Sequence, residues 1–171
     1  MAIYVPKDKL AQATLCLLVR GDPPGEVLLG YKKTGFGRGK YTGFGGKVEN
    51  GESIDAAALR EMEEESGVRI LPQDLQYVAK LTFLFPLRPE WNQEVHTYLA
   101  RTWQEDPVES DEMIPSWFAL DKIPYSHMWD DSTYWLPLLL AGRRIQASFV
   151  FTADNETVRE AEISDFTHQG E

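Results

Sequence analysis

The chain has 171 residues, 43% of them hydrophobic, and a formal net charge of −10 at pH 7. This length and composition suit one globular domain with a substantial core and exclude a largely disordered chain. The negative charge excludes a protein that follows a nucleic-acid polymer through a basic surface, so any bound phosphate must be held by a metal ion, backbone N–H groups or a few placed cations.

The amino-terminal residues Met1 to Lys7 lack the apolar core of a signal peptide, and no uncharged apolar run approaches the roughly 20 residues that span a bilayer. We therefore expect no contact with a membrane. Residues Thr14 to Val19 are aliphatic and β-branched, which predicts a strand buried on both faces with Cys16 packed as a small apolar residue. Cys16 is the only cysteine, which rules out an intrachain disulfide and fits the reducing cytoplasm.

Residues 21–25 contain two glycines and two prolines and predict a turn. Glu26 to Tyr31 then returns as the second strand of a hairpin. The following loop, residues 35–39, has glycine at every second position. Such a loop can let the backbone approach a ligand closely, although a plain connection fits it as well.

Residues Ser53 to Ser66 predict one helix. Ser53 can cap its first turn, because a serine oxygen accepts a hydrogen bond from an unpaired N–H group there. Gly67 suits its end, where a left-handed backbone conformation costs glycine little.

Three glutamates of this helix, Glu61, Glu64 and Glu65, fall on one face at 100° per residue and span roughly a third of the circumference. Carboxylates held together in this way favour a hard divalent cation, Mg²⁺ or Mn²⁺, which often bridges protein carboxylates to substrate phosphates. A solvated acidic helix face is the alternative interpretation.

The second half of the chain predicts further strands and one helix. The strands are Leu75 to Phe85, Glu94 to Arg101, Ser116 to Leu120, Gln146 to Phe151 and Thr157 to Ile163. The first two form a long hairpin and the last two a closing hairpin. Tyr134 to Leu140 predicts a helix that Pro137 should bend or shorten. Strands on either side of helices predict an α/β (α+β) sandwich with a mixed sheet, a single domain over residues 1–171 with its core at about residues 12–164.

Nine residues in and before the central helix have the spacing of the Nudix box. They are Gly46, Glu52, Arg60, Glu61, Met62, Glu64, Glu65, Gly67 and Val68. Nine specified positions at fixed spacing rarely match by chance, so the chain resembles the Nudix hydrolase family. The resemblance implies an α-β-α sandwich and a metal-dependent pyrophosphohydrolase. In it Glu61, Glu64 and Glu65 bind the metal ion, and one of them can orient the attacking water.

Within that family, four further stretches are similar to the mammalian-type MutT homologues, which hydrolyse oxidised purine nucleoside triphosphates to the monophosphate and pyrophosphate. These stretches are residues 32–37, 43–48, 107–113 and 127–135. The resemblance implies that the Gly46 carbonyl and the Glu112 carboxylate join the metal site. It also implies a base pocket, whose expected residues are Thr14, Lys32, Phe36, Thr42, Phe83, Met113, Trp129, Asp131 and Ser132. Aromatic and methionine side chains suit a flat, polarisable base, but they are equally common in an ordinary core.

Two pocket positions depart from the family pattern. Thr42 stands where the family has Asn, so a single hydroxyl replaces an amide donor and acceptor. Asp131 keeps the first of two family aspartates, whereas Ser132 replaces the second and Asp130 replaces a proline. Because paired carboxylates can share a proton and bind either purine face, the loss of one leaves the base preference open.

The expected function is therefore Mg²⁺-dependent hydrolysis of 8-oxo-dGTP or 2-hydroxy-dATP by a cytoplasmic monomer that sanitises the nucleotide pool. We expect Arg60 to hold a glutamate by a bidentate hydrogen bond. One alternative is the same chemistry on a dinucleoside polyphosphate or a methylated purine triphosphate. Another is a module that binds nucleotides without turnover, which the intact box carboxylates disfavour. The catalytic base and the phosphorus attacked stay open.

Overall fold

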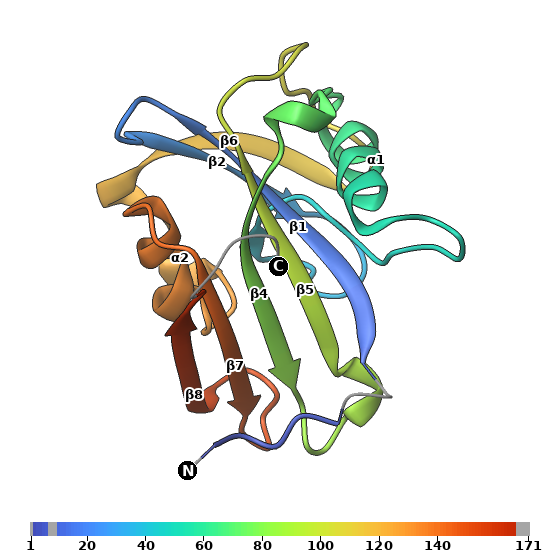
Figure 1. Cartoon of the computed structure of the whole chain (residues 1–171), viewed down its shortest axis with the longest axis vertical. Helices are drawn as coiled ribbons and strands as arrows, with labels where there is room; N and C mark the ends of the chain where they lie inside the picture. Colours follow the sequence, from blue (N-terminus) through green and yellow to red (C-terminus); the bar gives the residue numbers. More distant parts are fainter. Residues whose placement is uncertain (1, 7–9, 167–171) are drawn as a thin grey trace.

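The computed structural model describes residues 2–6 and 10–166, and these form one mixed eight-stranded sheet with two α-helices (Figure 1). The strand order is β3-β2-β1-β5-β4-β7-β8, and β6 also pairs with β2. The elements are β1 Ala11–Arg20, β2 Glu26–Lys32, β3 Tyr41–Thr42, α1 Ile54–Ser66, β4 Gln76–Leu84, β5 Gln93–Ala100, β6 Met113–Ala119, α2 Ser132–Leu140, β7 Ile145–Phe151 and β8 Val158–Asp165, with 3-10 turns at Pro72–Asp74, Pro89–Trp91, Leu120–Lys122 and Tyr125–His127.

All three predicted hairpins are present as antiparallel pairs: β1 with β2, β4 with β5, and β7 with β8. The pairs β1–β5 and β4–β7 are parallel, which makes the sheet mixed as predicted. The short strand β3 was not predicted. β6 begins earlier than predicted, at Met113 instead of Ser116, because it pairs with β2 along its whole length from Lys32 to Glu26.

The two faces of the sheet carry separate cores, each covered by one helix. On β1, Leu17 and Val19 belong to the core under α2, whereas Cys16 and Leu18 belong to the core under α1. Successive side chains of a strand point to opposite faces, so an apolar run such as 14–19 fills both cores. Cys16 is fully buried, and this burial raises the pKa of its thiol to about 12. The predicted α-β-α sandwich and the apolar packing of Cys16 are confirmed.

The ends of α1 form as predicted. The Ser53 hydroxyl accepts a hydrogen bond from the Ala56 N–H at 3.1 Å. Gly67 is left-handed, with φ of 78°, and its N–H donates to the Glu63 carbonyl at 2.8 Å. The caps fix where the helix begins and ends, and the packing of Ala58 and Met62 in the core fixes which way each glutamate points.

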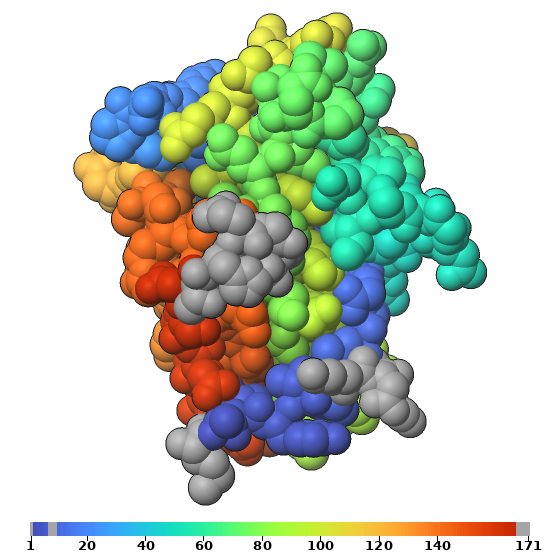
Figure 2. All heavy atoms as spheres, viewed as in Figure 1, coloured from blue at the N-terminus to red at the C-terminus, as the bar shows by residue number. Residues whose placement is uncertain are grey.

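Helix α2 is short, nine residues, and carries Pro137 in its interior. A proline there removes one N–H donor from the helix, yet the helix ends at the predicted Leu140 and begins two residues before the predicted Tyr134, so it is not shortened. None of the helices in residues 2–6 and 10–166 is long and apolar enough to cross a membrane. Residues 2–6 lie across one end of the molecule beside β8 (Figure 2), where they share a shallow depression with Leu84 and Arg159.

Candidate active site

The glycine-rich loop between β3 and α1 is tied to β1 through its backbone. Thr14 donates its N–H to the Gly46 carbonyl at 2.9 Å, and Cys16 and Phe44 exchange two hydrogen bonds of 2.6 and 2.9 Å. A methyl group at Gly45 would overlap the carbonyl of Thr14, and one at Gly46 would overlap the carboxylate of Glu61. Glycine therefore lets the loop pass between β1 and α1.

We expect Gly45→Ala to lower the free energy of unfolding by about 3 kcal/mol or more, because the added methyl group collides with backbone that cannot move without breaking the β1 contacts. Gly25→Ala is the matched control, since a methyl group there meets nothing closer than 4.0 Å. Urea denaturation measures both. Equal stability of the two variants would show that the close passage is not needed.

The acidic side chains of the box differ strongly in burial. Glu65 is 2% exposed, and its Oε1 accepts a hydrogen bond from the Gly45 N–H at 3.0 Å. The Glu61 side chain is 14% exposed, whereas that of Glu64 is 59% exposed and turned toward Arg60. Glu112, just before β6, is exposed, but its charge acts on both Glu61 and Glu65. Glu61 and Glu65 are therefore shielded from solvent and within the electrostatic reach of Glu112, whereas Glu64 lies at the exposed edge of the site.

Burial raises the pKa of Glu65 to about 8; the Gly45 N–H opposes this shift, the Glu61 charge adds to it, and the Lys32 charge opposes it. Burial also raises the pKa of Glu61, against the influence of Arg60. Neighbouring carboxylates with raised pKa values ionise more easily beside a cation, so this pair fits a hard metal ion.

The donors here are all oxygen atoms: the carboxylates of Glu61, Glu65 and Glu112, and the Gly46 carbonyl, which accepts hydrogen bonds from the Thr14 N–H at 2.9 Å and from the Thr14 hydroxyl at 3.4 Å. Within the described part of the chain, no group of three or more acidic, histidine or cysteine side chains is arranged so that it could hold a metal ion by itself. An ion at this place would need oxygens from the backbone, water or substrate phosphates as well, which is how Mg²⁺ is usually held.

Arg60 holds the carboxylates of the loop and helix in place. Its Nε and Nη2 donate to the two oxygens of Glu52 at 2.6 and 3.0 Å, which confirms the expected bidentate hydrogen bond. Its Nη1 donates to Glu61 and to Glu64, both at 3.2 Å. The hydrogen bonds from Arg60 to Glu52 lower the pKa of Glu52 to about 2, and the hydrogen bond from the Glu49 N–H lowers it further. Arg60 is therefore a positioning residue.

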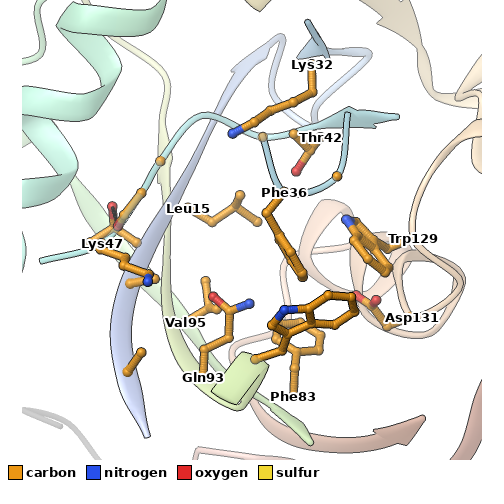
Figure 3. Close-up of a pocket in the computed structure, with 18 of the residues that line it drawn as sticks. Leu15, Lys32, Phe36, Thr42, Lys47, Phe83, Gln93, Val95, Trp129 and Asp131 are labelled. Atoms are coloured by element: carbon orange, nitrogen blue, oxygen red, sulfur yellow. Dashed lines mark hydrogen bonds between the residues drawn. The ribbon is translucent and has the colours of Figure 1, made fainter. Parts of the chain in front are cut away.

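A cavity of about 420 Å³ opens beside the buried glutamate (Figure 3). Its wall includes Gly46 and Glu65 at one side. All the residues that the sequence predicts for the base pocket line this same cavity: Thr14, Lys32, Phe36, Thr42, Phe83, Met113, Trp129, Asp131 and Ser132. The predicted base pocket and the buried end of the predicted metal site therefore form one continuous space.

Aromatic rings form the flat walls of the cavity. Phe36 and Trp129 stack with ring centroids 5.1 Å apart and an interplanar angle of 21°. Trp91 meets Phe36 edge-on at 5.2 Å. Phe83 lies on β4 and stacks on Phe149 at 5.7 Å. Such rings offer flat, polarisable surfaces to a purine.

Asp131, which precedes α2, is a second deeply buried acid of the cavity besides Glu65, at 4% exposure. Its Oδ2 accepts a hydrogen bond from the Trp135 Nε1 at 2.7 Å. Burial raises the pKa of Asp131 to about 6, partly opposed by that hydrogen bond. The other carboxylate oxygen makes no hydrogen bond from a side chain among residues 10–166, so it is available to a ligand that reaches it.

Among the lining residues that sequence reasoning missed are Lys47, Trp91, Gln93 and Trp135. Trp135 could have been found, because it follows Asp131 by one helical turn. Gln93 could have been found by extending the predicted strand 94–101 by one residue, since alternation then puts it on the same face as Val95. Trp91 lies in a turn that carries no comparable signal.

Comparisons with known proteins agree with this geometry. The NUDIX domain family model matches residues 9–139. The chain is 47% identical over 138 residues to the oxidized purine nucleoside triphosphate hydrolase of Danio rerio, covering 81% of this chain and 85% of the relative. It is 43% identical over 145 residues to the enzyme of the same description from Mus musculus, covering 85% and 88%.

Among solved structures, the MutT protein from Bacillus halodurans superimposes with a TM-score of 0.76 at 23% identity, covering 90% of this chain and 97% of that one. At this identity the likeness concerns the fold alone. The family match spans most of the chain, and it contains the glycine loop, α1 and the acidic residues described above. The chain therefore belongs to the Nudix hydrolase family.

Proposed function

We propose that this Nudix hydrolase cleaves oxidised purine nucleoside triphosphates to the monophosphate and pyrophosphate. One observation carries the proposal: every residue expected to contact the base lines a single cavity that continues to Glu65 and Gly46. A purine between the aromatic walls would therefore direct its phosphates toward the box carboxylates. Two relatives that are 47% and 43% identical and are described as such hydrolases support this substrate class.

We assign a divalent ion, Mg²⁺ or in its place Mn²⁺, to the oxygens of Glu61, Glu65, Glu112 and Gly46, with Glu64 as a further ligand from the rim. When bound, this ion neutralises phosphate charge and lowers the pKa of a water molecule.

The protein's own groups position the rest of the reaction. Lys32 brings a positive charge near Glu65, on the path that the phosphates would follow. Arg60 fixes Glu61 and Glu64 at 3.2 Å each, so that the carboxylate that accepts the proton from the attacking water keeps its direction. The Gly45 N–H holds Glu65 in the same way.

We further propose that the protein acts as a cytoplasmic monomer on free nucleotides, with no nucleic-acid polymer or membrane as partner, and that residues 1–171 form one Nudix domain. The net charge of −10 would repel a polynucleotide. The outer strand β8 carries exposed charged residues, Arg159, Glu160 and Glu162, which discourage edge-to-edge pairing with a second copy.

The test compares kcat/KM with Mg²⁺ for 8-oxo-dGTP, 2-hydroxy-dATP and dGTP, together with methylated purine triphosphates and dinucleoside polyphosphates. We expect an oxidised purine triphosphate to exceed dGTP by at least about tenfold, since a pocket contact worth about 1.4 kcal/mol gives that factor. Equal values for the oxidised nucleotides and dGTP would overturn the proposal. Hydrolysis in ¹⁸O-water identifies the phosphorus attacked.

A further inference from the structure

Gln93 places a polar amide beside Ala11, Phe83 and Val95, the apolar strand residues that form the floor of the cavity. It begins β5 and lies in the sheet between Phe83 of β4 and Ala11 of β1, its partners in the two neighbouring strands. Figure 3 shows its side chain entering the cavity from the same side as Phe83 and Val95. Sheet alternation explains this direction, because Gln93 and Val95 are two residues apart on one strand.

The Gln93 amide is half-buried and makes no hydrogen bond to any residue in the ranges 2–6 and 10–166. The neighbouring amide of Asn92, by contrast, is already used, because its Oδ1 accepts the Phe85 N–H at 2.7 Å. An amide that a ligand covers without pairing to it loses its hydrogen bonds to water, which is unfavourable. The floor therefore favours a ligand that offers Gln93 both a donor and an acceptor.

The chemistry of oxidised purines supplies that pair. Oxidation at C8 creates a carbonyl at C8 and a proton on N7, side by side, which together form the edge of a cyclic amide. A carboxamide also carries a donor and an acceptor side by side, so the two can form two parallel hydrogen bonds. An unmodified purine has a bare N7 acceptor and a C–H group at C8, and it can form only one of them.

We propose that Gln93 is a specificity-determining residue that recognises the N7–H and C8 carbonyl edge of 8-oxopurine nucleotides. This inference rests on the proposed function and names the base modification that the cavity selects. Gln93 would compensate for the departures at Thr42 and Ser132, because part of the base recognition would move from these positions to the floor of the cavity. Recognition by Gln93 would also disfavour purines oxidised only at C2, whose N7 lacks a proton.

The experiment compares the wild-type chain with Gln93→Met, which keeps the length of the side chain and removes its amide. The measurement is the ratio of kcat/KM for 8-oxo-dGTP to that for dGTP with Mg²⁺. We expect the variant to lower this ratio by about tenfold or more, since a site that pairs with a substrate N–H rejects the analogue that lacks it. Gln146→Met, at an exposed position of β7, makes the same chemical change away from the cavity and should keep the wild-type ratio.

A second substrate, 8-bromo-dGTP, separates recognition of the cyclic amide from recognition of bulk at C8. It has a large C8 substituent but no N7 proton. Wild-type protein should prefer 8-oxo-dGTP to 8-bromo-dGTP, and Gln93→Met should reduce that preference by the same factor.

A Gln93→Met protein that is folded and keeps both wild-type ratios would overturn the inference. If this variant does not fold, Gln93→Glu replaces it, because the carboxylate keeps the size and the acceptor but removes the donor; the same two ratios then decide. Wild-type protein that prefers neither 8-oxo-dGTP nor 2-hydroxy-dATP to dGTP contradicts the proposed function itself, whereas a preference for 2-hydroxy-dATP without one for 8-oxo-dGTP contradicts this inference alone. Both results are obtained before any variant is made.

Discussion

Glu65→Gln should lower kcat by at least about a thousandfold at saturating Mg²⁺ while the protein stays folded. The amide keeps the shape of the side chain, and its oxygen can still accept the Gly45 N–H now bound at 3.0 Å. What it removes is a carboxyl group that can ionise beside a cation, on which the proposed metal site depends. A thousandfold loss corresponds to about 4 kcal/mol of transition-state stabilisation, which is within the several kcal/mol that a catalytic metal ion supplies.

Stability separates this explanation from simple misfolding. Burial raises the pKa of Glu65 to about 8, so its ionised form is unfavourable in the fold. A neutral glutamine should leave the free energy of unfolding unchanged or raise it. Glu63→Gln, the same change at an exposed position of α1, is the matched control and should keep full activity. A folded Glu65→Gln protein with the wild-type kcat would remove Glu65 from the metal site.

Glu64→Gln tests the third predicted ligand. We expect kcat to fall by orders of magnitude here as well, with the fold intact, because an exposed side chain contributes little to stability. A rate near that of the wild type would mean that Glu64 only balances the charge of Arg60.

The box predicted the residues of the site but not their burial. At 100° per residue, Glu65 lies about 40° from the direction midway between Ala58 and Met62, Glu61 about 80° and Glu64 about 140°. Ala58 and Met62 face the sheet, and burial of the glutamates falls in the same order. The order of burial of the three glutamates could therefore be calculated from the sequence, but only by someone who knew that Ala58 and Met62 lie on the buried face.

Long-range pairing lies beyond such local reasoning. The hairpins follow from turns between neighbouring strands, which sequence patterns indicate well. The pairing of β6 with β2 and of β1 with β5 joins segments far apart in the chain, and no local pattern specifies it. Gln93 enters the cavity only because β5 lies between β1 and β4. The bond between Trp135 and Asp131, by contrast, joins residues four apart in the chain, and helical spacing could have indicated it.

Asp131→Asn should make the protein more stable at neutral pH and a poorer enzyme. Burial raises the pKa of Asp131 from its ordinary value of 3.8 to about 6, so folding favours the protonated form. The stability that this preference provides is complete below about pH 4 and is lost as the pH rises through about 6. A shift of about two pH units corresponds to about 3 kcal/mol at 1.36 kcal/mol per unit.

Asparagine is neutral at every pH and can still accept the Trp135 Nε1 bond of 2.7 Å. The stability difference between Asp131→Asn and wild type should therefore rise by about 3 kcal/mol from pH 4 to pH 7.5 in urea denaturation. Asp121→Asn, at an exposed position, should show no such rise. A flat difference would place the carboxylate in contact with water.

The same substitution should lower kcat/KM for oxidised purine triphosphates by at least about tenfold, because an amide cannot take up the proton that a carboxylate near its pKa exchanges with the base. Stability and activity then change in opposite directions at one residue. Such a result is expected for a buried acid whose ionised form lowers the stability of the fold but is needed to bind the ligand. If Asp131→Asn gained stability and kept its activity, the buried charge would have no role in base recognition, and selection would depend on Thr42, Ser132 and Gln93 alone.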